Sequence, residues 1–93
     1  MTVDFTSEAR IEWLDAISYY NSQRSNLGLE FAIEVDRTLA NIVEYPEGLP
    51  LVGPRTRRSL VRRFPYAVMY YVHRDTILVV SVANLRRKPK EWQ

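Results

Sequence analysis

Residues 57–83 read RRSLVRRFPYAVMYYVHRDTILVVSVA. Three runs rich in β-branched and aromatic residues predict three strands, at residues 57–63, 66–72 and 76–83. The polar residues 73–75 form a tight connection between the last two runs, which we therefore expect to pair as a hairpin. Residues 77–80 are apolar at four consecutive positions, which favours a central strand covered on both faces. The stretch predicts the antiparallel part of a sheet.

Toward the N-terminus the apolar residues recur with the period of an α-helix. Two successive stripes are formed by Ala9, Trp13, Ala16, Ile17 and Tyr20, and then by Phe31, Val35, Leu39 and Ile42. The polar run 21–26 and Gly28 are expected to break the first helix, and Pro46 to end the second. Residues 3–5 alternate and predict a short strand. The expected fold is α+β: a short N-terminal strand, a two-helix hairpin, and a three-stranded antiparallel meander, all forming one sheet.

Length and composition narrow the class of protein. A chain of 93 residues can build one hydrophobic core, so we expect a single domain over residues 1–93. The chain has no cysteine and one histidine, and it has no Gly-rich phosphate loop. We therefore expect no metal and no cofactor. No apolar stretch approaches the roughly 20 residues that span a bilayer, and no signal-peptide pattern is present. A cytoplasmic protein without a membrane partner is expected.

The net charge of +2 conceals a separation of charge along the chain. Residues 1–48 hold nine acids and three arginines, whereas residues 49–93 hold ten basic residues and two acids. Such an asymmetry indicates a nucleic acid or an acidic protein as partner. The alternative is that the acidic half neutralises the basic half within the fold.

The basic residues of the second half are the candidate binding site. The predicted target- or nucleic-acid-binding residues are Arg55, Arg57, Arg58, Arg62, Arg63, Arg86, Arg87, Lys88, Lys90 and Trp92. Side chains alternate across a strand, so Arg58 and Arg62 should share one face of strand 57–63. Arg57 and Arg63 should share the other. Brought together, the two basic groups would form a positive surface that attracts phosphates. The alternative is a solvated, charged edge that limits aggregation.

Catalytic chemistry finds little support in the residue types. His73 lies in a predicted turn and is expected to be a solvated turn residue. The basic half offers only Asp75 and Glu91 as carboxylates, so no acid–base pair can be assembled around a phosphate. Tyr66 and Tyr70 could stack on bases, but their spacing favours packing in the core. No catalytic residue is predicted.

Three segments of the second half carry a resemblance to a known family. They are RRFPYAVMYY (residues 62–71), VSVA (80–83) and RRKPKEW (86–92). In their order and spacing they resemble the RelE/ParE toxins of type II toxin–antitoxin modules. Glu12-Trp13, Tyr19-Tyr20, Leu27-Gly28 and Tyr45-Pro46 also match the pattern. The resemblance extends over about residues 3–92.

The resemblance implies a toxin of a plasmid-stabilisation or stress module. Its partner would be a cognate antitoxin encoded beside it, in a toxin–antitoxin hetero-oligomer. RelE-like toxins cleave mRNA on the ribosome, whereas ParE-like toxins poison DNA gyrase.

Three positions bear on the choice between these activities. Ribonucleolytic relatives often place an arginine straight after the tyrosine of this strand, where the chain has Ala67. Many end with a catalytic tyrosine a few residues beyond a basic one, where the chain has Trp92. ParE-like chains often carry a histidine before the terminal basic run, where the chain has Asn84. We therefore expect a ParE-like inhibitor that binds DNA gyrase without chemistry of its own. The alternatives are a RelE-like, ribosome-dependent mRNA endonuclease and a basic RNA-binding module.

Overall fold

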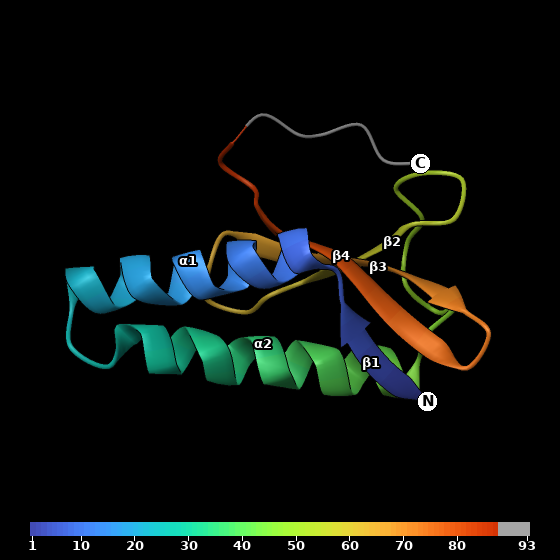
Figure 1. The fold of residues 1–93 in the computed structure, drawn as a ribbon, viewed down its shortest axis with the longest axis horizontal. Coiled ribbons are helices and arrows are strands. Elements are labelled where there is room, and N and C mark those ends of the chain that lie inside the picture. Colours follow the sequence, from blue (N-terminus) through green and yellow to red (C-terminus); the bar gives the residue numbers. More distant parts are fainter. Residues whose placement is uncertain (88–93) are drawn as a thin grey trace.

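The computed structural model describes residues 1–87. Its elements are β1 (Thr2–Phe5), α1 (Ser7–Gln23), α2 (Leu27–Glu44), β2 (Arg57–Leu60), β3 (Tyr66–His73) and β4 (Thr76–Asn84). The strands form one sheet in the order β1-β4-β3-β2, in which β1 runs parallel to β4 and the other pairs are antiparallel (Figure 1). The predicted fold class, the order of elements and the three-stranded meander are confirmed.

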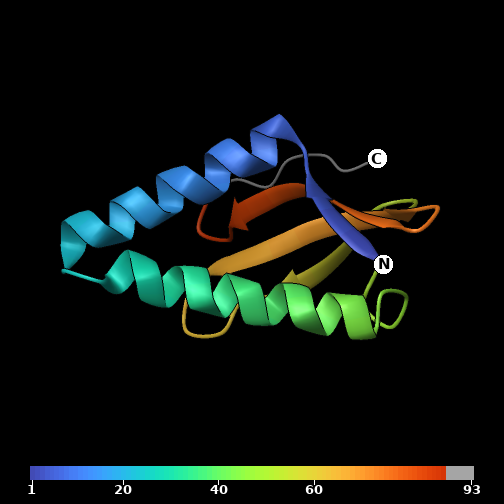
Figure 2. The ribbon, with the colours of Figure 1, turned by 60° about the horizontal axis from the view of Figure 1, so that its bottom comes forward.

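The helical hairpin packs its apolar stripes on one face of the sheet (Figures 1 and 2). Phe31, Val35 and Ile42 of α2 are fully buried, as the helical spacing predicted. They meet core side chains of β3 and β4, among them Val68 and Val79.

β4 has the predicted central place, between β1 and β3, but the prediction that both its faces are covered is wrong. Ile77 and Val79 on the helix side are fully buried, whereas Leu78 and Val80, which alternate with them, are only partly buried. Because the helices cover one face of the sheet only, an apolar run at consecutive positions does not by itself show two covered faces.

Gly28 lies inside α2 and does not break a helix, contrary to the sequence prediction. The connection between the helices is residues 24–26, where Asn26 takes a left-handed φ of 68°. A Cβ on Gly28 would lie 2.3 Å from the carbonyl oxygen of Ile17. The glycine therefore allows α1 and α2 to approach closely at this end of the hairpin.

β2 ends at Leu60, so the predicted strand 57–63 is three residues too long. Val61 donates from its backbone N–H to the carbonyl of Tyr66 at 2.9 Å and closes the connection to β3. Arg63 has a left-handed φ of 72°, and Pro65 has no N–H to offer to a strand ladder. Arg62 and Arg63 therefore lie in a turn, and the predicted alternation of arginines across the sheet does not extend to them.

Candidate functional site

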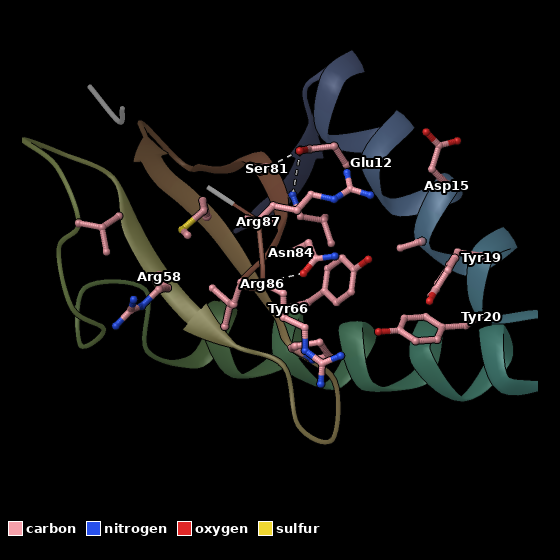
Figure 3. A pocket seen from close by; sticks show the side chains of 17 residues that line it. Glu12, Asp15, Tyr19, Tyr20, Arg58, Tyr66, Ser81, Asn84, Arg86 and Arg87 are labelled. Atoms are coloured by element: carbon pink, nitrogen blue, oxygen red, sulfur yellow. Dashed lines mark hydrogen bonds between the residues drawn. The ribbon is translucent and has the colours of Figure 1, made fainter. Parts of the chain in front are cut away.

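A pocket of about 710 Å³ opens beside the C-terminal half of β4 (Figure 3). β1 ends at Phe5, whose register partner is Val79, so β4 continues beyond β1. The backbone N–H of Thr6 donates to Val79 at 2.9 Å, and α1 then runs along this part of β4. The pocket therefore follows from the difference in strand length, because β1 ends early and leaves room beside the longer strand β4.

Glu12 connects α1 to the exposed edge of β4. One of its carboxylate oxygens accepts from the Ser81 hydroxyl at 2.8 Å and from the Val82 backbone N–H at 3.2 Å (Figure 3). β1 is too short to pair with the Val82 N–H at this edge of β4. The carboxylate of Glu12 accepts the hydrogen bond instead, and a carboxylate is a strong acceptor. The carboxylate of Glu12 is held in place and forms one wall of the pocket with Asp15.

Tyrosines form the second wall. Tyr20 packs against Tyr66 and Phe64, with ring centroids 6.0 and 4.9 Å apart, and Tyr19 of α1 also lines the pocket. Burial raises the pKa of Tyr66 and of Tyr20 above the ordinary value of a phenol. Both hydroxyls, which carry their proton at neutral pH even at the ordinary pKa of a phenol, are held in that form more firmly by their burial.

The tyrosines of β3 are core residues, as their spacing predicted. Tyr66 and Tyr70 are buried on the helix side of the sheet, and the Tyr70 hydroxyl donates to the Pro46 carbonyl at 2.7 Å. Tyr66 nevertheless reaches the pocket, so one residue belongs both to the core and to the site.

Arginines form the third wall. Arg58 reaches the pocket from β2, and Arg86 and Arg87 reach it from the turn after β4. Asn84 shapes that turn: its side-chain oxygen accepts from the Arg86 N–H at 2.9 Å, and its carbonyl accepts from the Arg87 N–H at 3.2 Å. In Figure 3 the Glu12 side chain points from α1 toward Ser81, and the Tyr20 side chain points toward Tyr66.

The other predicted binding residues lie elsewhere. The Arg55 guanidinium sits 4.0 Å from the centre of the Tyr71 ring, and Arg57 donates to the Leu49 carbonyl at 2.7 Å. Both line a second, smaller hollow of about 280 Å³. Arg62 is exposed in the turn before β3. The structure thus brings three of the predicted arginines, 58, 86 and 87, to one pocket and places 55 and 57 at another. Lys88, Lys90 and Trp92 lie outside the described residues.

Arg63 is engaged by the acidic half of the chain. It donates to Glu30 of α2 at 2.8 Å, and Arg24 approaches the other oxygen of the same carboxylate at 3.2 Å. The hydrogen bonds from Arg63 and Arg24 lower the pKa of Glu30. Neutralisation of the basic half by the acidic half, within the fold, is the alternative to an external partner that the charge separation allows. At Arg63 this alternative holds.

The acidic and aromatic wall of α1 was missed from the sequence. Glu12, Asp15 and Tyr19 occupy positions i, i+3 and i+7 and therefore share a helix face. This spacing was the available signal, beside the apolar stripe of the same helix. This face belongs to the acidic half of the chain, outside the basic residues that were predicted to bind.

His73 is exposed, as predicted, but it is the last residue of β3 and not part of the turn, which residues 74–75 form. It does not line either pocket. Within residues 1–87 no group of three or more His, Cys, Asp or Glu side chains could hold a metal ion. In the same part of the chain no helix is long and apolar enough to cross a membrane.

Comparisons with known proteins find the fold but no sequence relative. No family model matches the chain, and no curated protein matches it.

A solved structure of the chromosomal ParDE toxin–antitoxin system of P. aeruginosa is similar, with a TM-score of 0.80 at 13% identity, over 91% of this chain and 96% of that one. The isolated E. coli RelE toxin is also similar, with a TM-score of 0.64 at 24% identity, over 94% of this chain and 86% of that one. The E. coli RelBE toxin–antitoxin complex gives a TM-score of 0.63 at 24% identity, over 92% of this chain and 98% of its matched chain. The resemblance seen in the sequence is confirmed at the level of the fold, and the chain has the fold of the ParE and RelE toxins.

Proposed function

We propose that the chain is the toxin of a type II toxin–antitoxin module, active in the cytoplasm and neutralised by a cognate antitoxin. The observation that carries the proposal is the match of nearly the whole chain to the ParDE structure at a TM-score of 0.80. The RelE toxin and the RelBE complex share the same fold. The motifs of residues 62–71, 80–83 and 86–92 add independent support from the sequence.

We further propose a ParE-like activity, in which the chain binds and inhibits DNA gyrase. The TM-score is higher for ParDE than for RelE, 0.80 against 0.64. Ala67, where ribonucleolytic relatives often have an arginine, is fully buried. In the pocket, burial raises the pKa of Tyr66, and Glu12 is held by two hydrogen bonds to β4. These groups suit the recognition of a surface better than the transfer of protons.

The second candidate is a ribosome-dependent mRNA endonuclease. One observation favours it: Arg58, Arg86 and Arg87 line a single pocket with two carboxylates. Cations around a hollow of this size could bind a phosphate, and a neighbouring carboxylate is a group that catalyses proton transfer. Assays on both targets separate the two candidates.

The assignment as a toxin is tested through its antitoxin. We expect expression of the chain to arrest growth, and co-expression of the small protein encoded by an adjacent gene to relieve the arrest. The purified pair should bind less tightly as salt rises, because acidic side chains of the antitoxin would meet exposed arginines whose attraction salt screens. Titration calorimetry at low and high salt measures this. Growth arrest that no adjacent gene product relieves, or a complex that salt leaves unchanged, would contradict the proposal.

A further inference from the structure

The turn after β4 decides where two adjacent arginines point. Side chains of consecutive residues in an extended strand lie on opposite faces of the sheet. If β4 continued past Asn84, Arg86 and Arg87 would therefore project to opposite sides. In the structure both side chains line the same pocket. The chain has to leave the strand in one particular way to bring together two guanidinium groups whose like charges repel.

Asn84 makes the hydrogen bonds that shape this turn. Its side-chain oxygen accepts from the Arg86 N–H (Figure 3), and its carbonyl accepts from the Arg87 N–H. An asparagine favours such a turn because its side chain bonds the backbone two residues further on. The Leu85 N–H donates to the Pro65 carbonyl at 2.7 Å, which fastens the turn to the connection before β3.

Each of the two arginines acts on one tyrosine of the pocket. Burial is the largest influence on the pKa of Tyr66 and of Tyr20, and it raises both. The positive charge of Arg87 opposes this rise in the pKa of Tyr66, and that of Arg86 opposes it for Tyr20. The side chain of Asn84 also forms a hydrogen bond with Tyr66, its register partner on β3. One asparagine therefore contacts both the backbone of the arginines and the aromatic wall that they face.

The direction of this turn matters little to the rest of the described fold. Asn84 is only partly buried, and residues 85–87 are exposed. β4 is the last element among the described residues, so no later described element depends on where the turn leads. What the turn does determine is the position of the two arginines in the pocket.

We propose that Asn84 is a positioning residue of the binding site, which holds the backbone of residues 85–87 so that Arg86 and Arg87 meet an anionic group of the target together. This role rests on the proposed function, because inhibition of the target is the activity that it serves. Without the turn the two arginines would have to be ordered on binding, and this loss of conformational freedom would weaken the complex.

The holding of the turn is measured on the isolated chain by 15N relaxation. The backbone order parameters of Arg86 and Arg87 should be near about 0.85 in the wild type and below about 0.6 in Asn84→Ala. Asn84→Asp keeps a side-chain acceptor and should leave the turn rigid. Asn41→Ala is the matched control, because Asn41 is exposed on α2 and does not line the pocket. The Tm of each variant should lie within about 4 °C of the wild type.

The consequence for binding is measured as inhibition of gyrase supercoiling. Asn84→Ala should raise the half-inhibiting concentration about fivefold, which corresponds to about 1 kcal/mol. Asn84→Asp and Asn41→Ala should stay within about twofold of the wild type. When Arg86 and Arg87 are already alanine, Asn84→Ala should have no further effect, because no guanidinium group is left to position.

Three results would overturn the role of Asn84. They are a turn in Asn84→Ala as rigid as in the wild type, full inhibition by a variant whose turn is loosened, and an equal loss of inhibition when both arginines are absent. A wild type that does not inhibit gyrase refutes the gyrase target instead. The variants are then compared by growth arrest at equal expression, where an Asn84→Ala variant as toxic as the wild type would overturn the positioning role. If the wild type arrests no growth either, the toxin assignment fails, and the order parameters alone decide whether Asn84 holds the turn.

Discussion

Replacing Gly28 by alanine is expected to lower the free energy of unfolding by about 2 kcal/mol. The new Cβ would lie 2.3 Å from the Ile17 carbonyl oxygen and 2.6 Å from Cγ of Asn21. The first of these is backbone, so α1 and α2 would have to separate. Overpacking of this kind costs about 1–3 kcal/mol, while the better helix propensity of alanine returns up to about 1 kcal/mol.

The same substitution disturbs a hydrogen bond. The Gly28 N–H donates to the side-chain oxygen of Asn21 at 2.8 Å, and this oxygen lies 2.7 Å from the position of the added Cβ. Thermal and urea unfolding measure the effect, which for a chain of this size corresponds to about 10 °C in Tm.

Gly48→Ala is the matched control. A Cβ on Gly48 would meet Tyr45 Cβ at 3.5 Å and the Tyr45 carbonyl oxygen at 3.7 Å, which are ordinary contacts. Its effect should stay within about 0.5 kcal/mol. Equal stability of the two variants would show that the helices do not need their close approach at Gly28.

The double substitution Arg86→Ala/Arg87→Ala is expected to weaken inhibition of the target at least about tenfold. Arginine is among the residues that dominate interface energies, commonly at 2 kcal/mol or more each. Both side chains are exposed and reach the pocket from the turn that Asn84 holds. The fold should be unaffected, with a change in stability of about 0.5 kcal/mol or less. The concentration of protein that halves gyrase supercoiling measures the loss.

The double substitution Arg55→Ala/Arg62→Ala is the matched control, because it removes two positive charges outside the pocket. Arg55 lines the second hollow, and Arg62 lies in the turn before β3. This control should keep most of the inhibition. If both double variants lose activity equally, the effect comes from net charge, and the pocket has no special part in binding.

The elements of the fold could be predicted because each has a strong local signal. The stripe of α2 and the hairpin of the last two strands are local patterns, and both predictions are confirmed, although the connection is residues 74–75 and not 73–75. The end of β2 was missed because a turn with a left-handed Arg63 has no sequence signal comparable to a glycine. The role of Gly28 was predicted wrongly because the glycine is required by the close approach of the Ile17 carbonyl. Ile17 is eleven positions away in the chain, so no local pattern shows this contact.

The basic residues of the candidate site could be predicted from the sequence, but its acidic residues could not. Arg86 and Arg87 follow the last strand, and their basic run is visible in the sequence. Glu12 and Asp15 come to the same pocket from α1 because β1 is shorter than β4. That difference in length determines which side chains meet, and it depends on pairing between the two ends of the chain.

The central claim, that the chain acts on gyrase by binding, is tested most directly by one experiment with two substrates. The purified chain is added to a DNA gyrase supercoiling reaction and, in parallel, to ribosomes programmed with mRNA. We predict that supercoiling falls with increasing protein while the ribosome-bound mRNA stays intact. Codon-specific cleavage of the mRNA, with gyrase unaffected, would contradict the account and establish the endonuclease in its place.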